Sequence, residues 1–316
     1  ASSLPSERDQ NFLLIENSSK AHYVLKIANQ KEKKEVLELQ NAAMQRIGSC
    51  LNPSLCPQVC LTKHGRSIER ICLRNQTSHL IRMVTYVQGQ PLTQVSCQTP
   101  DLLCSVGEFM ARIDQALFGF EHAAAKREFH WDLQKGPETV NRLIKHFNTQ
   151  NQVKLVQYFL DKYLTQISDV LPGLRKSIIH NDGNDHNILV GFSPDPQHSR
   201  GLKVSGIIDF GDMVHSYTVG DIAVAAAYAM LDKKDFMQAV SYVVNGYQKI
   251  MALSDNELKA LPHLIYMRLC MSVSICAYQK KQNPDNEYLV VTENKAWDLL
   301  RRIQKTYKSW TSFLRR

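Results

Sequence analysis

Two segments decide the fold: Ser177-Ile-Ile-His-Asn-Asp-Gly-Asn-Asp-His-Asn-Ile-Leu-Val190 and Val204-Ser-Gly-Ile-Ile-Asp-Phe-Gly-Asp212. Both contain apolar runs of strand length beside clusters of polar residues. Asp182 and Asn187 lie in the first cluster, and Asp209 follows the apolar run of the second. Carboxylate and amide oxygens at strand ends are suited to hold a divalent cation and to accept a proton.

The spacing of these residues matches the catalytic layout of kinase-like phosphotransferases, which is His-x-Asp, then Asn, then a strand-borne Asp before Phe-Gly. Such an enzyme holds a triphosphate through metal ions and aims an acceptor hydroxyl in line with it. Asp182 is predicted to accept the proton of that hydroxyl, while Asn187 and Asp209 are predicted to ligate Mg²⁺. His180 is expected to brace the loop rather than to react. Each residue alone is a common turn former, so the prediction rests on their combination.

A lysine in the N-terminal region fits the same layout. Lys26 interrupts an apolar strand-like run, as does the kinase lysine that pairs with the α- and β-phosphates and with a Glu of the following helix. Glu38 is the predicted partner and Glu35 the alternative, since both lie in the helix predicted over residues 33–47. An exposed lysine on an edge strand is the competing interpretation.

The turn that would cover the phosphates spans residues 4–12 and contains no glycine. It is therefore neither G-x-G-x-x-G nor Walker A, and backbone N–H groups with Ser6 and Arg8 are predicted to contact phosphate. The chain begins almost on this turn, so either a preceding segment is missing or the N-terminal lobe is short. Asp221, after Val219-Gly220, is expected to cap a helix or to order the loop after Asp209.

Hydrophobic periodicity divides the chain into a β-rich and a mainly helical region. The first has an expected hairpin (11–15 and 22–27), the helix 33–47 and strands near 59–61, 68–73 and 80–86. Helices are expected from Thr99-Pro100, over 152–171, after the Ser254–Glu257 capping box and over 292–314. The predicted class is α+β, with a nucleotide-binding lobe (residues 1–87), a catalytic and substrate-binding lobe (88–316) and a cleft between them.

Composition adds few constraints. The 316 residues are 44% hydrophobic and 22% charged, with a formal net charge of +8. Basic residues near the C-terminus interleave with apolar ones at helical spacing, so neither a nucleic-acid nor a membrane partner is expected. The eight cysteines form no C-x-x-C pair, and the start of the chain resembles no secretory signal. Reduced thiols in a cytoplasmic enzyme are the expectation.

The sequence resembles the aminoglycoside phosphotransferase/choline kinase-like family, and residues 180–187 and 208–212 carry this resemblance. Within it the likeness is greatest to the hydroxylysine kinases and to kinase domains fused to class III aminotransferases. That likeness extends over segments 8–12, 23–27, 39–41, 85–89, 131–133 and 284–289. Asn181 departs from the pattern, since Gly is usual there.

The resemblance implies a protein-kinase-like two-lobed fold and Mg²⁺-dependent transfer of phosphate from ATP or GTP to a small-molecule hydroxyl. It implies that the backbone from Thr85 to Val87 meets the purine, and it gives the family roles to the residues assigned above. It also implies an aminotransferase as a fused or separate partner.

The acceptor is inferred from charge. Carboxylates at Asp185 and Asp212 flank the predicted acceptor position and suit a cationic amino acid or amino alcohol, with 5-hydroxylysine first. Homoserine, choline or ethanolamine, and an aminoglycoside are the rival substrates, and a catalytically silent nucleotide-binding module is the rival class. A protein kinase is disfavoured, because a helix is expected about ten residues after Asp209, leaving no room for a long activation segment.

Overall fold

A computed structural model describes residues 1–6, 8–72, 77–192, 201–282 and 293–313. The N-terminal part is one antiparallel sheet with a helix, α1 (Lys34–Cys50), against it. The strands run in the order β1-β2-β3-β6-β4, and β5 also pairs with β6. Their bounds are β1 Ser2–Leu4, β2 Gln10–Ile15, β3 His22–Ile27, β4 Val59–Cys60, β5 Glu69–Cys72 and β6 Ser78–Thr85.

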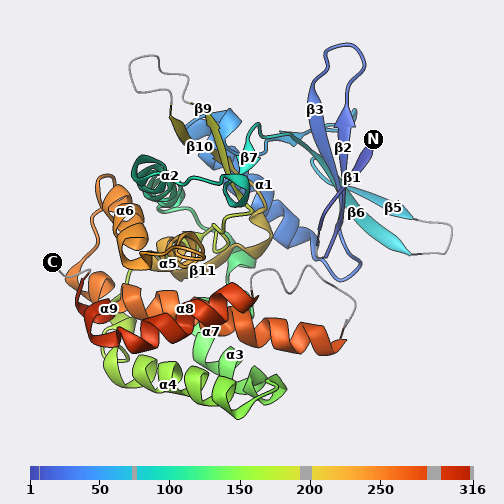
Figure 1. The fold of residues 1–316 in the computed structure, drawn as a ribbon. Coiled ribbons are helices and arrows are strands. Elements are labelled where there is room, and N and C mark those ends of the chain that lie inside the picture. The colour runs from blue at the N-terminus through green and yellow to red at the C-terminus, as the bar shows by residue number, and fades with distance from the viewer. Residues whose placement is uncertain (7, 73–76, 193–200, 283–292, 314–316) are drawn as a thin grey trace.

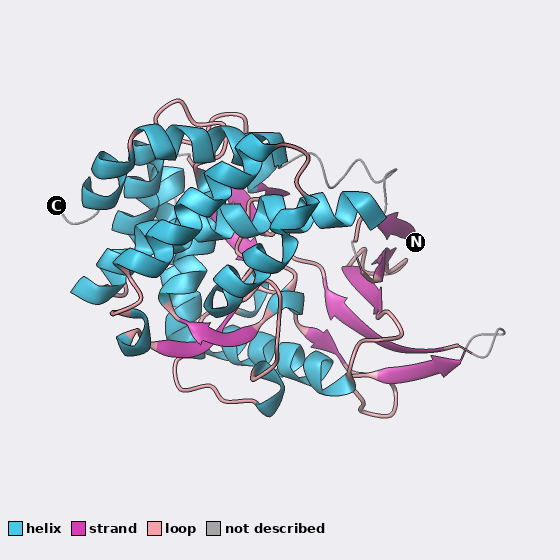
Figure 2. Cartoon of the chain, turned by 90° about the horizontal axis from the view of Figure 1, so that it is seen from below, coloured by secondary structure: helices cyan, strands magenta, loops and turns pink. Residues whose placement is uncertain are grey.

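The remaining described chain is a larger helical lobe that carries two small sheets (Figures 1 and 2). One sheet has the order β10-β9-β7 and the other pairs β11 with β8. The strands are β7 Gln90–Pro91, β8 Lys176–Ile179, β9 Ile188–Phe192, β10 Leu202–Ile207 and β11 Val214–Tyr217. The helices are α2 Pro100–Leu117, α3 Gly136–Leu143, α4 Gln150–Gln166, α5 Val219–Ala229, α6 Phe236–Gln248, α7 Asp255–Gln282, α8 Glu293–Lys305 and α9 Tyr307–Phe313. The two-lobed α+β fold is confirmed, while the boundary at residue 87 stays a prediction.

Most elements form where the sequence predicts them. The hairpin β2–β3, the N-cap at Thr99 and the Ser254–Glu257 capping box agree with expectation. Thr99 Oγ1 accepts from Leu102 N–H, and Ser254 Oγ accepts from Glu257 N–H. Helix α4 begins earlier than predicted, at a capping box made by Thr149 and Gln152, and ends at Gln166. The single C-terminal helix predicted over 292–314 is wrong: α8 ends at Lys305 and α9 begins at Tyr307.

Close packing in the helical lobe depends on glycine. A Cβ atom at Gly107 of α2 would lie 1.8 Å from the carbonyl oxygen of Val243 in α6. One at Gly246 of α6 would lie 2.0 Å from the carbonyl oxygen of Cys104 in α2. The two helices therefore meet backbone to backbone, and any side chain at either glycine would push them apart.

Helix α7 crosses the centre of this lobe (Figure 1). Among the described residues it is the one helix long and apolar enough to span a membrane by length and composition, and 89% of that apolar window is buried inside the protein. It therefore has the character of a core helix.

Candidate active site

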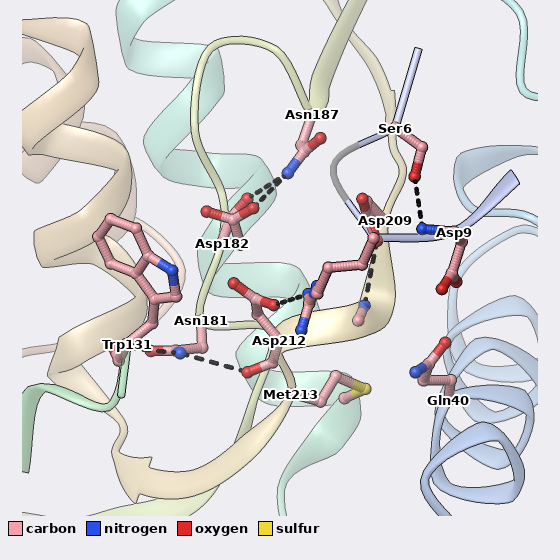
Figure 3. A network of polar contacts seen from close by, with 12 residues as sticks. Ser6, Asp9, Gln40, Trp131, Asn181, Asp182, Asn187, Asp209, Asp212 and Met213 are labelled. Carbon is pink, nitrogen blue, oxygen red and sulfur yellow. Dashed lines mark hydrogen bonds and ion pairs between the residues drawn. The ribbon is translucent and has the colours of Figure 1, made fainter. Parts of the chain in front are cut away.

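The catalytic loop lies between β8 and β9, and it is tied together through Asp182. Asn184 Nδ2 donates to Asp182 Oδ1 at 2.9 Å, and Asn187 Nδ2 donates to Oδ2 at 2.7 Å (Figure 3). The amide oxygen of Asn187 is thereby turned away from Asp182. Asp182 and Asn187, both predicted from their spacing, thus form one hydrogen-bonded group with Asn184, and the amide oxygen of Asn187 is available to a cation.

Asp221 anchors this loop from α5. Its carboxylate is completely buried and accepts from the backbone N–H groups of His180 at 3.1 Å and Asn181 at 2.7 Å. It does not cap the helix, because Thr218 is the N-cap and no side-chain cap bond forms. The expected capping role is therefore wrong, and Asp221 orders the catalytic loop itself.

Asn181 explains how the chain does without the usual glycine. Its φ is +65°, in the left-handed region that Asn tolerates better than most residues. Its side-chain Nδ2 donates to the carbonyl oxygen of Asp212 at 3.2 Å, as Figure 3 shows. The asparagine therefore keeps the backbone turn and adds a bond to the neighbouring loop.

Asp209 is held ready to bind a cation. It has a φ of +61°, its Oδ1 accepts from Gly211 N–H at 3.2 Å, and its side chain is 51% exposed. Partial desolvation alone would raise the pKa of this carboxyl, but Lys26, the Gly211 N–H and Arg8 lower it below its ordinary value. Lys26 Nζ lies 4.0 Å from Asp209 Oδ1. The structure therefore brings Lys26 and Asp209 together at one place in the fold.

Asp182 has the opposite electrostatic environment. Burial raises its pKa well above the usual range, the charges of Asp212 and Asp209 raise it further, and Arg268 opposes them. A carboxylate with increased proton affinity is better able to take a proton from an alcohol.

The predicted partner of Lys26 is wrong. Glu38 forms an exposed ion pair with Lys34 at 2.7 Å and is not among the buried residues of α1. The side chains that α1 turns toward the sheet are Gln40 and Asn41, and both accept hydrogen bonds from Arg82. Asn41 Oδ1 lies 2.6 Å from Arg82 Nη1.

Arg82 was missed by the sequence interpretation. It lies on β6 directly opposite Lys26, is 6% exposed, and its burial lowers its pKa to about 10. The sequence feature that could have identified Arg82 is a charged residue inside the apolar run of β6.

One cavity of about 840 Å³ joins these groups. Its apolar end is lined by Val24, Met44, Val84, Leu189 and Ile208, beside the segment from Thr85 to Val87. The N–H groups of Thr85 and Tyr86 donate to the carbonyls of Gln58 and His22. Among the described residues no backbone hydrogen bond from Val87 N–H is found, so this group can serve a ligand. The apolar end has the chemistry of a slot for a flat base.

Ser6 and Arg8, the two residues of the turn predicted to contact phosphate, make different contacts. Ser6 lines the cavity and its Oγ accepts from Asp9 N–H at 3.3 Å (Figure 3). Arg8 instead reaches across to Asp212, where Nη2 and Oδ1 are 2.5 Å apart. The structure thus brings together one residue predicted for phosphate and one predicted for the acceptor.

The two carboxylates predicted to face the acceptor, Asp185 and Asp212, lie in different places. Asp212 lines the cavity, whereas Asp185 does not. The carboxyl of Asp185 lies near Thr93, His186 and Lys295, and its backbone oxygen accepts from Thr93 N–H. The structure therefore places Asp185 beside Thr93, outside the cavity that would hold the acceptor, and the prediction that it faces the acceptor is wrong.

The acceptor end of the cavity is walled mainly by helices that the sequence did not implicate. Besides Asp182 and Asp212, its lining includes Trp131, Tyr228, Arg268, Ser272, Cys276 and Gln279. The only available signal for Arg268 was a cation within the apolar run of α7.

The donor atoms at the loop suit a hard divalent cation. Within the described part of the chain, no set of three or more His, Cys, Asp or Glu side chains forms a ready-made metal site. Asn187 and Asp209 nevertheless offer the oxygen ligands of a cation that is completed by phosphates and water, which is the usual binding mode of Mg²⁺. The residues present therefore fit a metal brought in with a nucleotide.

The sequence profile of the phosphotransferase enzyme family matches residues 2–253. This chain belongs to that family. It is 30% identical to hydroxylysine kinase from Mus musculus over 95% of its own length and 83% of the mouse protein. The segment 284–289, which contributed to the family likeness, lies outside the described residues.

Solved structures agree on the fold. A microcompartment-associated aminopropanol kinase matches with a TM-score of 0.74 at 17% identity, covering 98% of this chain and 92% of that one. Amicoumacin kinase, solved in complex with AMP-PNP, Ca²⁺ and Ami, matches with a TM-score of 0.68 at 14% identity, covering 95% of this chain and 87% of that one. The protein is a small-molecule kinase, a phosphotransferase with an alcohol group as acceptor.

Proposed function

We propose that the protein transfers the γ-phosphate of ATP or GTP to the hydroxyl of a cationic amino acid or amino alcohol, with 5-hydroxylysine as the first candidate. The observation that carries this proposal is the acceptor end of the cavity, where Asp212 lies beside Asp182. Two carboxylates there favour an acceptor with an ammonium group near its hydroxyl. The name of the mouse relative supports the choice of amino acid.

We infer the following roles for the site residues. The flat base would enter between the apolar side chains and Val87, with Thr85 beside it, while Lys26 and the turn around Ser6 would meet the phosphates. Asn187 and Asp209 would hold Mg²⁺, which supplies charge neutralisation for the transferring phosphoryl group. Asp182 would accept the proton of the acceptor hydroxyl as that oxygen attacks the γ-phosphorus.

Two further assignments have less support. Eight free thiols suit a cytoplasmic location. An aminotransferase partner is proposed only from the resemblance to fused kinase domains.

A matched substrate panel tests the proposed function. Purified protein would be given ATP or GTP with Mg²⁺ and, in parallel, 5-hydroxylysine, lysine, homoserine, ethanolamine, choline and an aminoglycoside. We expect phosphate on 5-hydroxylysine and none on lysine, which lacks the hydroxyl. EDTA should abolish transfer, and Asp182→Asn should slow it severely. Nucleotide binding without transfer to any acceptor would instead support a silent module.

A further inference from the structure

Helix α7 delivers a cation to the predicted catalytic carboxylate. Arg268 is 1% exposed, and its Nη2 donates to Asp182 Oδ1 at 2.9 Å. The two residues are 86 positions apart, so this contact exists only because α7 passes behind the catalytic loop. Nothing in the kinase layout itself calls for an arginine at this place.

The guanidinium is held by aromatic rings on two sides. Its Cζ lies 4.2 Å from the ring centroid of Trp131 and 5.6 Å from that of Tyr228. A cation stacked in this way is fixed in plane and direction. Asp182 therefore meets a rigid donor rather than a flexible one.

The burial of Arg268 beside Asp182 is not explained by a gain in folding stability. Arg268 Nε is buried without a hydrogen-bond partner in the described structure. Burying a charged pair commonly gives little or no net stabilisation compared with apolar residues of similar volume, and an unpartnered N–H is a further cost. A buried arginine with these costs points to a role in the site.

The donors around Asp182 show what that role can be. Arg268 and Asn184 both donate to Oδ1, while Asn187 donates to Oδ2. A carboxylate offers about four acceptor positions, so these three bonds leave about one, on Oδ2. The three donors together fix the plane of the carboxylate and the direction of that remaining position.

We propose that Arg268 is a positioning residue for phosphoryl transfer, which holds Asp182 in the single orientation that accepts the acceptor's proton. The inference rests on the proposed function of Asp182 as the proton acceptor. Because a small misplacement of a reacting group can slow a reaction strongly, loss of Arg268 is expected to lower kcat rather than weaken nucleotide binding.

The test compares Arg268→Met, Arg268→Lys, Asp182→Asn and the double variant Arg268→Met/Asp182→Asn, using the best acceptor of the panel. Arg175→Met is the matched control, since Arg175 also donates to a carboxylate, that of Glu257, but lies outside the cavity. We expect Arg268→Met to lose about 100-fold in kcat with an unchanged nucleotide Kd, and Arg268→Lys to lose less. In the double variant the two losses should not multiply, since residues that act as a unit are non-additive.

Chemical rescue gives a second readout if the slow variants approach the detection limit. Guanidinium at millimolar concentration should restore part of the rate of Arg268→Ala and leave Arg175→Ala unchanged. The inference is overturned if Arg268→Met binds nucleotide normally and keeps kcat within about threefold, a change too small for a positioning role. It is also overturned if the double-variant losses multiply fully, or if guanidinium affects both alanine variants alike. If the wild type phosphorylates no acceptor, the proposed function fails instead.

Discussion

Arg82 of β6 lies opposite Lys26 of β3, and it ties the sheet to α1 through a 2.6 Å bond from its Nη1 to Asn41 Oδ1. In the kinase layout this tie is an ion pair between the strand lysine and a helix glutamate. Here the neighbouring strand supplies the cation and α1 supplies two amides. Lys26 is left to approach Asp209, so the lysine and the helix are positioned by separate contacts.

Loss of the hydrogen bonds from Arg82 to α1 should raise the KM for the nucleotide. We expect Arg82→Gln to raise the nucleotide KM about tenfold, because α1 and the strand beside Lys26 lose their common partner. Glu38→Gln should change it less than twofold, since Glu38 pairs only with Lys34 in the described structure. Steady-state kinetics over a nucleotide series measures both. The opposite ranking would restore Glu38 as the partner of Lys26.

Replacing Asp209 should remove the metal-dependent step. Asp209→Asn keeps the size of the side chain but loses the charge that ligates a cation, so kcat/KM should fall at least about 100-fold. Titration with Mg²⁺ should show a higher half-saturating concentration for any residual activity. An unchanged Mg²⁺ dependence would place the metal elsewhere.

Charge at Asp212 should set the affinity for the acceptor. Asp212→Asn is expected to raise the KM of a cationic acceptor about tenfold, with a smaller effect on nucleotide, since the carboxylate lines the acceptor end. Asp185→Asn is the matched control, because that carboxyl lies beside Thr93, outside the cavity, and should leave the acceptor KM unchanged. Equal effects of the two substitutions would contradict the assignment of the acceptor end.

The buried Asp114 should make stability depend on pH. Its Oδ2 accepts from Tyr247 Oη at 2.6 Å, and burial, then the nearby charge of Asp221, raises its pKa well above the usual value. A raised carboxyl pKa stabilises the fold fully below the unfolded value of about 4, and that stabilisation is lost as pH rises toward the folded pKa.

Asp114→Asn mimics the protonated acid and cannot titrate. Relative to this variant, the wild type should therefore lose up to about 1.4 kcal/mol of unfolding free energy per pH unit above about pH 4. Urea unfolding at several pH values measures the difference, with Asp161→Asn on the exposed face of α4 as control. Parallel pH curves for wild type and Asp114→Asn would show that Asp114 is ionised in the fold.

The sequence by itself determined the element types, the two-lobed class and the core of the site. Strand and helix periods, caps and turns are local, and Asp182, Asn187 and Asp209 lie in two short segments whose spacing carries the chemistry. For the same reason it pointed to the glycine-free turn over residues 4–12, whose contact with phosphate stays a prediction.

Only the tertiary structure decided which side chains meet. On a helix, two or three residues rotate the side chain by about 200–300°, so Glu38 faces solvent while Gln40 and Asn41 face Arg82. The pairs Arg268–Asp182 and Arg8–Asp212 join residues 86 and 204 positions apart. Such contacts depend on how α7 and the N-terminal turn pack around the catalytic loop, and no local pattern in the chain encodes that packing.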